Sequence, residues 1–196
     1  MRIFAFLLSL IPFFAEASIA IGKPAPDFTL MSHTGEKVQL SSFKGKTVVL
    51  EWYNYGCPFV RKHYDTKNMQ NTQSKYKDKV VWLSIVSSAK GKQGFLATTS
   101  EAAEKYKEEG MSSHALLLDH NGDVGRLFGA KVTPHMFIIN DQGNVVYEGA
   151  IDNILSANPA DVAKATNYVA LALDELFQGQ KIKKARSDAY GCAVKY

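Results

Sequence analysis

The sequence predicts a layered α/β domain built on a mixed β-sheet. Runs of β-branched and apolar residues alternate along the chain with segments rich in helix-forming residues, which is typical of domains whose strands and helices occupy separate layers. The chain has 196 residues, enough to bury a hydrophobic core without a framework of disulfides. Its hydrophobic and charged fractions, 46% and 21%, are those of ordinary globular proteins and exclude a disordered or fibrous chain.

Short extended runs predict the strands of this sheet. Phe28–Met31 and Lys37–Leu40 are joined by a turn at residues 33–36 and predict a hairpin at the start of the domain. Residues 47–53 and 80–86 are continuous β-branched, apolar and aromatic runs, which indicate strands buried on both faces. Further strands are expected at Ala115–Leu118, Met136–Ile139 and Val145–Tyr147.

Helix signals separate these strands. A helix over residues 58–76 should begin at its proline, whose missing N–H would find no partner there, and should be disturbed near residues 65–66. Residues 99–109 are rich in helix formers. The clearest helix is the last, expected between the capping residue Asn158 and Gly179. Its apolar residues at helical spacing are Val162, Val169, Leu173, Leu176 and Phe177.

The first twenty residues predict a cleaved secretory signal. Met1 and Arg2 give a positive start, and residues 3–14 form an almost unbroken apolar run. This run is too short for a permanent membrane anchor, which takes roughly 20 residues. Residues 15–17 and 18–20 each offer the small-x-small pattern that signal peptidase needs. An uncleaved anchor or a buried first helix is the alternative.

The mature chain is expected to consist of one domain, residues 21–180, and a C-terminal tail, residues 181–196. A periplasmic or secreted location follows from the signal, with no stable membrane insertion after cleavage, and a disulfide can persist there. The net charge of +4 is spread along the chain and does not indicate nucleic-acid binding. Two cysteines are too few for a disulfide framework or a four-cysteine zinc site.

Cys57 is the first candidate for chemistry. It lies between a predicted buried strand and Pro58, so we expect it at the N-terminus of a helix. The free N–H groups and the positive end of the helix dipole favour a thiolate there. A thiolate is the nucleophile that attacks a disulfide or a peroxide oxygen. The alternative is a small buried residue that never reacts.

Two stretches resemble the redoxin branch of the thioredoxin superfamily, which includes peroxiredoxins and exported thiol-disulfide oxidoreductases. Residues 40–52 resemble the entry to the active-site strand, and residues 132–134, Val-Thr-Pro, resemble the cis-proline loop that faces the active cysteine. The resemblance covers about residues 21–152. It implies a thioredoxin-like fold, with a central mixed sheet flanked by helices, an N-terminal hairpin and a C-terminal tail. It also implies that Thr133, Pro134 and His135 contact the substrate.

The sequence departs from the patterns of this superfamily at several positions. Val60 stands where the second cysteine of a Cys-x-x-Cys pair would be. Asn54 stands where peroxiredoxins have Thr or Ser, and Pro134 where they have the arginine that polarises the peroxide. Asn54 is expected to donate a hydrogen bond at the site. Arg61, one helical turn after Cys57, is expected to lower its pKa, although it could be a surface residue.

Glu51 aligns with the buried acid beneath the active cysteines of thioredoxins. A carboxyl in such a strand would have a raised pKa and could shuttle the thiol proton, although a surface glutamate paired with a lysine is equally consistent with the sequence. His63 and His135 are the nearest imidazoles that could tune the thiolate. With only one cysteine in the loop, the ligand set for a soft metal is short, and we predict no metal and no cofactor.

Cys192 is the second candidate. It lies in the tail, beyond a basic stretch, Lys181–Arg186, that we expect to be a flexible connection. From there it could approach Cys57 of its own chain, or of a partner in a homodimer, and act as a resolving thiol, as the resemblance to some two-cysteine peroxiredoxins implies. A static disulfide between the two cysteines, or two independent thiols, are the alternatives.

These features together predict an exported thiol oxidoreductase. Its activity would be antioxidant, of the peroxiredoxin type, or thiol-disulfide exchange, with Cys57 as nucleophile and Cys192 as possible resolving thiol. Its partners would be a thiol electron-donor protein and an oxidised protein or peroxide substrate. The alternative is a non-catalytic redoxin-like binding module in which a Cys57–Cys192 disulfide is structural.

Overall fold

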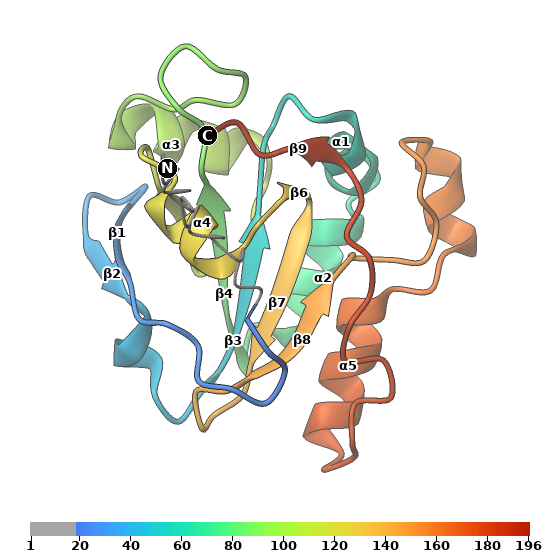
Figure 1. Ribbon diagram of the computed structural model, residues 1–196. Coiled ribbons are helices and arrows are strands. Elements are labelled where there is room, and N and C mark those ends of the chain that lie inside the picture. The colour runs from blue at the N-terminus through green and yellow to red at the C-terminus, as the bar shows by residue number, and fades with distance from the viewer. Residues whose placement is uncertain (1–18) are drawn as a thin grey trace, which may run out of the picture.

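A mixed β-sheet lies at the centre of the computed structural model, which describes residues 19–196 (Figure 1). Its strands are β1 (Thr29–Ser32), β2 (Lys37–Gln39), β3 (Thr47–Trp52), β4 (Val80–Val86), β5 (Ala115–Leu118), β7 (His135–Ile139) and β8 (Val145–Gly149). They are ordered β2-β1-β5-β4-β3-β7-β8. The central strands β3, β4 and β5 are parallel, while β7 runs antiparallel to β3 and β1 antiparallel to β5. The predicted mixed sheet and N-terminal hairpin are therefore confirmed.

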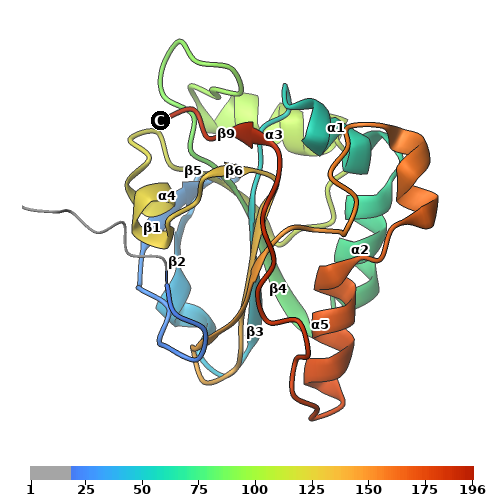
Figure 2. The ribbon, with the colours of Figure 1, turned by 45° about the vertical axis from the view of Figure 1, so that its right-hand side comes forward.

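Helices cover both faces of this sheet. The helices are α1 (Pro58–Asp65), α2 (Asn68–Tyr76), α3 (Thr99–Glu108), α4 (Asp123–Phe128) and α5 (Tyr168–Phe177). Helices α1, α2, α3 and α5 lie on one face, and α4 lies on the other with the N-terminal segment (Figure 2). Successive strand residues point to opposite faces of the sheet. In β3, Val49 therefore packs on the face covered by α1, α2, α3 and α5, and Leu50 packs on the face covered by α4.

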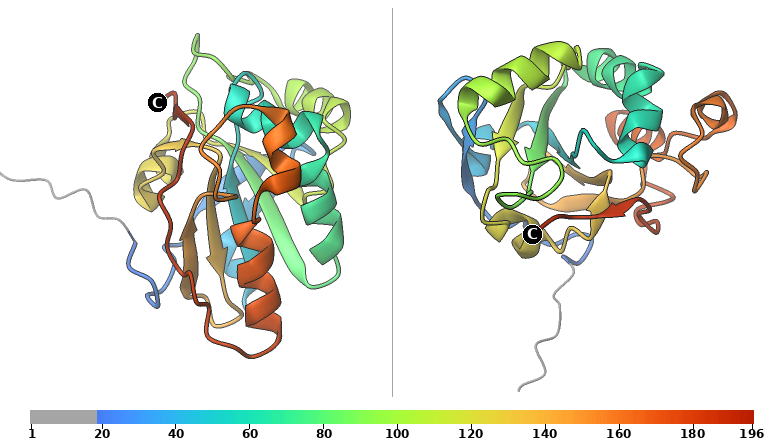
Figure 3. Two further views of the ribbon diagram at one scale, coloured as in Figure 1. Left: turned by 90° about the vertical axis from the view of Figure 1, so that its right-hand side faces the viewer. Right: turned by 90° about the horizontal axis from the view of Figure 1, so that it is seen from above.

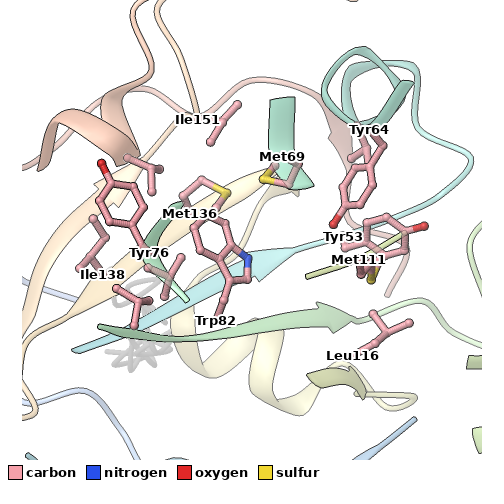
Figure 4. Close-up of a cluster of buried hydrophobic side chains, with 14 of the residues drawn as sticks. Tyr53, Tyr64, Met69, Tyr76, Trp82, Met111, Leu116, Met136, Ile138 and Ile151 are labelled. Carbon is pink, nitrogen blue, oxygen red and sulfur yellow. The ribbon is translucent and has the colours of Figure 1, made fainter. Parts of the chain in front are cut away.

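The core beneath α1, α2 and α5 is rich in aromatic residues. Tyr53, Tyr64, Tyr76 and Trp82 are at most 4% exposed and pack with Met69 (Figure 4). Every residue of β3 and β4 is buried. Sheet residues covered on both sides have little freedom to move, so the loops at the ends of these strands are mounted on a rigid base.

Two helical segments differ from the prediction. The disturbance expected near residues 65–66 is a break between α1 and α2, where Lys67 adopts a left-handed φ of 61°. The single last helix is wrong, because the segment forms a 3₁₀ helix at residues 159–164 and then α5. The side chain of Asn167 caps α5 by accepting a hydrogen bond from the N–H of Ala170 at 2.9 Å. Of the expected apolar face, Val169 and Leu173 are buried, whereas Phe177 is 37% exposed.

The basic stretch at residues 181–186 is packed against the sheet, so the expected flexible connection there is wrong. The N–H of Glu148 donates to the carbonyl of Ala185, and the N–H of Ser187 donates to the carbonyl of Glu148, both at 3.0 Å. Arg186 forms an ion pair with the Glu148 carboxylate at 2.8 Å. Figure 3 shows the tail running the length of the sheet from the end of α5 to the C-terminus.

Most of the predicted signal segment lies outside the described residues, and the division into residues 21–180 and 181–196 stays a prediction. Between residues 19 and 196, no helix has the length and apolar character that crossing a membrane requires.

We expect Leu50→Ala to lower the free energy of unfolding by about 2–5 kcal/mol, because this side chain is fully buried in the middle of β3 and its loss leaves a cavity. Urea denaturation measures the change. Leu155→Ala is the matched control, since Leu155 is 68% exposed and its truncation should change stability by no more than about 0.5 kcal/mol. Equal losses in the two variants would contradict the assignment of this core.

Candidate active site

Cys57 lies at the end of the loop that joins β3 to α1. It is the N-cap residue of that helix, followed by Pro58 in the first turn, and its side chain is fully buried. A turn precedes it, because the N–H of Cys57 donates to the Asn54 carbonyl at 3.0 Å and the N–H of Gly56 donates to Asn54 Oδ1 at 2.9 Å. The sulfur therefore sits at the positive end of a helix dipole, as predicted.

A neighbouring loop braces this turn. Asn54 Nδ2 donates to the Gln93 carbonyl at 3.0 Å, and Gln93 Nε2 donates back to the Gly56 carbonyl at 2.9 Å. A Cβ on Gly56 would come within 2.7 Å of the Gln93 side chain, so any larger residue there would displace that side chain. The amide of Asn54, predicted to donate a hydrogen bond at the site, is thus engaged in holding the loop. Its effect on Cys57 runs through the backbone.

The predicted cis-proline loop faces Cys57. The Thr133–Pro134 peptide bond is cis, and the Cys57 thiol donates to the Thr133 carbonyl oxygen at 3.1 Å. Thr133 belongs to a short strand, β6 (Val132–Thr133), that pairs antiparallel with β9 (Cys192–Ala193) in the tail. In that ladder Cys192 stands opposite Thr133. The fold therefore brings both cysteines of one chain to the same residue, Thr133.

Gly191 allows the tail to come this close. Its φ is +145°, which side chains of L-residues rarely adopt, and a Cβ there would lie 2.0 Å from the Thr133 carbonyl oxygen. A residue with any side chain would push β9 away from β6. Nothing in the sequence singles out this glycine, because only the fold brings the tail against the cis-proline loop.

The two thiols are electrostatically unequal. Burial opposes ionisation of Cys57, but hydrogen bonding from the thiol and backbone of Cys192, together with the backbone of Val60 at the helix start, brings its pKa below the usual thiol value. Burial and the neighbouring Cys57 raise the pKa of Cys192 to about 11. Cys57 is thus the thiol that ionises first, and Cys192 is the proton donor beside it. Both are free thiols in the structure.

Glu51 is buried in the central strand β3, and no lysine among residues 19–196 forms an ion pair with it. Its Oε2 accepts hydrogen bonds from Trp82 Nε1 at 2.8 Å and Ser84 Oγ at 2.9 Å, and its Oε1 accepts one from Tyr64 at 2.8 Å. Burial raises its pKa despite these donors. The surface ion pair considered as an alternative is therefore wrong. A role in moving the Cys57 proton stays a prediction.

Arg61 points to carboxylates. Its guanidinium contacts Asp65, with Nη2 at 2.6 Å from Oδ1, and binds both carboxylate oxygens of Glu109. Glu109 follows α3, far along the chain, so the sequence could not show this partner. The structure does not bring the guanidinium to Cys57, and its predicted effect on that thiol has no contact to support it.

The two histidines near the site are buried and neutral at pH 7. Burial lowers the pKa of each imidazole to about 4. His135 packs against Phe137 at a ring-centroid distance of 4.7 Å, on the sheet face that α4 covers, while His63 Nδ1 contacts Asn68 at 2.8 Å. Among residues 19–196, no three or more acidic, His or Cys side chains are grouped so that they could hold a metal ion.

The sequence model of the family described as Redoxin matches residues 20–168. The chain belongs to the Redoxin family. The predicted redoxin branch is therefore confirmed.

Relatives of this Redoxin chain include thiol-disulfide oxidoreductases. ResA of Bacillus thuringiensis subsp. konkukian is 26% identical over 136 residues, which cover 69% of this chain and 73% of ResA. ResA of Bacillus subtilis is also 26% identical, with 68% and 69% covered.

Solved structures confirm the thioredoxin-like fold. A hypothetical protein from Sinorhizobium meliloti matches with a TM-score of 0.73 at 21% identity, covering 92% of this chain and 96% of that one. The thioredoxin domain of a thiol-disulfide oxidoreductase from Bacteroides vulgatus matches with a TM-score of 0.53 at 23% identity, covering 67% and 89%. At these identities the likeness is one of fold.

We expect Gly191→Ala to slow formation of a Cys57–Cys192 disulfide in this Redoxin protein by about 10–100-fold, because an added Cβ would displace Cys192 by a distance that matters for a reaction between positioned groups. Mass mapping of the cross-link after addition of oxidised glutathione measures the rate. Gly179→Ala is the control: its φ is also positive, at +69°, but its Cβ would meet nothing within 4 Å. Similar rates in both variants would contradict the placement of β9.

We expect the difference in unfolding free energy between wild type and Glu51→Gln to become smaller as the pH rises from about 4 to neutral. The carboxyl of Glu51 in the unfolded chain titrates at ~4.3, and burial raises its pKa in the folded state. The folded state therefore binds more protons than the unfolded state in this pH range. The stability of the wild type therefore falls with rising pH, and glutamine removes that titration. Unfolding free energies at about pH 4.5 and 7.5 measure the difference.

Glu36→Gln, in the exposed turn between β1 and β2, controls for the loss of one charge. A gap between wild type and Glu51→Gln that widened as the pH rose would contradict a buried carboxyl with a raised pKa.

Proposed function

We propose that this Redoxin protein is an exported thiol-disulfide oxidoreductase, with Cys57 as the attacking thiolate and Cys192 as the resolving thiol. The observation that carries the proposal is the pairing of β9 with β6, which sets Cys192 beside Cys57 of the same chain. The cysteine missing at position 60 is thereby replaced by one from the tail. The names of the ResA relatives support the same reaction class.

The chemistry follows from the two pKa shifts. The Cys57 thiolate attacks one sulfur of a substrate disulfide, the substrate S–S bond breaks, and the departing thiolate takes up a proton. Cys192 then loses its proton and attacks the Cys57 sulfur, which forms the Cys57–Cys192 disulfide and releases the second substrate thiol. The substrate gains two electrons and the two cysteines lose two. A dithiol donor protein returns these electrons in the same steps run in reverse.

Several contacts favour a disulfide over a peroxide as the substrate. The Asn54 amide is engaged with Gln93, Pro134 occupies the place of the peroxiredoxin arginine, and Arg61 is bound to two carboxylates. Among these residues, none supplies a free cation or side-chain donor at Cys57 that would polarise an O–O bond. The antioxidant activity predicted from the sequence is therefore the less supported of the two.

Export rests on the apolar run and small-x-small patterns of the first twenty residues. An oxidising compartment would allow the Cys57–Cys192 disulfide to persist between cycles. The donor protein stays a prediction, as does a homodimer; the placement of both thiols in one chain means that resolution needs no second subunit.

We expect the reduced protein to release two thiols from a disulfide-bonded peptide and to end with a Cys57–Cys192 link. Cys57→Ser should lower the rate by at least about a thousandfold, because it removes the nucleophile. Cys192→Ser should complete the first step and accumulate a mixed disulfide between Cys57 and the peptide. Thiol release and peptide mass mapping measure both outcomes.

The two single variants serve as controls for each other, since each removes one thiol from the same site. A parallel reaction with one equivalent of hydrogen peroxide distinguishes the peroxidase: faster formation of the link from peroxide than from the peptide would favour that activity. A wild type in which neither reagent forms the link, and in which both serine variants lose equal stability, would leave the non-catalytic binding module instead.

A further inference from the structure

A buried lysine lies on the side of α1. Lys62 is 0% exposed, and its Nζ contacts Asp152 Oδ2 at 3.0 Å, the carbonyl of Ile154 at 2.9 Å and the Tyr190 hydroxyl at 3.2 Å. An ammonium group has three protons to donate, and these contacts use all three. The charge is paired with the carboxylate of Asp152, itself 2% exposed.

Tyr190 connects this buried pair to the tail. Its hydroxyl donates to Asp152 Oδ1 and accepts from Lys62, so it is hydrogen-bonded to both members of the ion pair. Its ring packs edge-on against Phe59, with centroids 5.8 Å apart and planes at 70°. Tyr190 is 7% exposed. The tail is thus held by directional bonds to α1 and to the segment after β8.

This cluster is close to Cys192 along the chain. Only Gly191 separates Tyr190 from Cys192, and extended backbone advances at most about 3.6 Å per residue. Lys62 is in the same helix that carries Cys57 at its start. One rigid helix therefore holds the attacking sulfur at its N-terminus and the anchor of the resolving thiol on its side.

The cluster of Lys62, Asp152 and Tyr190 is better suited to positioning the tail than to stabilising the folded state. A buried ion pair contributes little net stability compared with apolar residues of the same volume, because both charges lose their hydration. Hydrogen bonds of fixed direction, however, admit one register of the tail, whereas an apolar contact would allow β9 to slide along β6. The other tail contacts lie farther from Cys192 on its N-terminal side, where Ser187 N–H donates to the Glu148 carbonyl, or beyond it, where Val194 N–H donates to the Lys131 carbonyl and Tyr196 to the Ala130 carbonyl.

We propose that Tyr190, held by Lys62 and Asp152, is a positioning residue that sets Cys192 against Cys57 and so determines how readily their disulfide closes. The inference rests on the proposed function, in which that disulfide forms in each cycle. Loss of the hydroxyl loosens Cys192, lowers its effective concentration at Cys57 and weakens its support of the Cys57 thiolate.

The test uses Tyr190→Phe, which keeps the ring and removes the hydroxyl. Equilibration of the full chain with reduced and oxidised glutathione gives the constant for disulfide closure. We expect this constant to fall about tenfold, which corresponds to a reduction potential about 30 mV less negative. The alkylation profile of Cys57 should shift to higher pH in the same variant. Tyr76→Phe is the matched control, because its hydroxyl also binds a carboxylate, Asp174, at 2.7 Å but belongs to α2.

A purely structural role gives a different result. Tyr190→Phe would then lower the unfolding free energies of the oxidised and reduced proteins equally and leave the glutathione constant unchanged, which would overturn the inference. Should Tyr190→Phe fail to fold, Phe59→Leu removes the ring contact alone and should move the constant in the same direction. A wild type that never forms the Cys57–Cys192 disulfide would instead overturn the proposed function, and the inference with it.

Discussion

The site depends on a short piece of backbone pairing between β6 and β9. This pairing places Cys192 opposite Thr133, whose carbonyl oxygen accepts from the Cys57 thiol at 3.1 Å. Without it Cys57 would be a single cysteine at a helix start, without a partner thiol and without the hydrogen bonds from Cys192 that help to lower its pKa. With it, a thiol of lowered pKa and a thiol of raised pKa lie side by side, although they are 135 positions apart in the sequence.

The rest of the fold holds this pairing in place from three directions. The fully buried strand β3 carries the loop before Cys57, and the loop around Gln93 braces that loop from outside. The turn of the chain at Pro134 presents β6. The tail is fixed before Cys192 by Tyr190 and after it by Tyr196, whose hydroxyl donates to the Ala130 carbonyl at 2.7 Å. Thiol chemistry that needs close approach is thus built on elements with little freedom.

Local sequence signals predicted much of this framework. Residues 47–52 of the β-branched run predicted at 47–53 form β3, and Pro58 begins α1, because strand burial and helix starts depend on the residues themselves. Helix α4 was missed, since it is only six residues long and contains Gly125. The last helix was predicted as one because the apolar spacing continues past Asn167, which caps α5 instead of lying inside it.

The parts of the site that the sequence could not show depend on distant partners. Arg61 looked like a neighbour of Cys57, but its guanidinium binds Glu109, which only the packing of α3 brings near. Nothing in the sequence singled out Lys62, because its buried partners Asp152 and Tyr190 lie far along the chain. The tail seemed mobile because it is basic and lies at the end of the chain, and its pairing with β8 and β6 is set by backbone groups that carry no sequence signal.

The position of Cys192 near the C-terminus gives the chain an unusual topology when it is oxidised. A bond to Cys57 would close residues 57–192 into a ring that contains most of the molecule. By the entropy of loop closure such a ring would stabilise the folded state by ~5 kcal/mol. Resistance to proteases would then be greater in the oxidised protein than in the reduced one, so that the lifetime of the chain would follow its redox state.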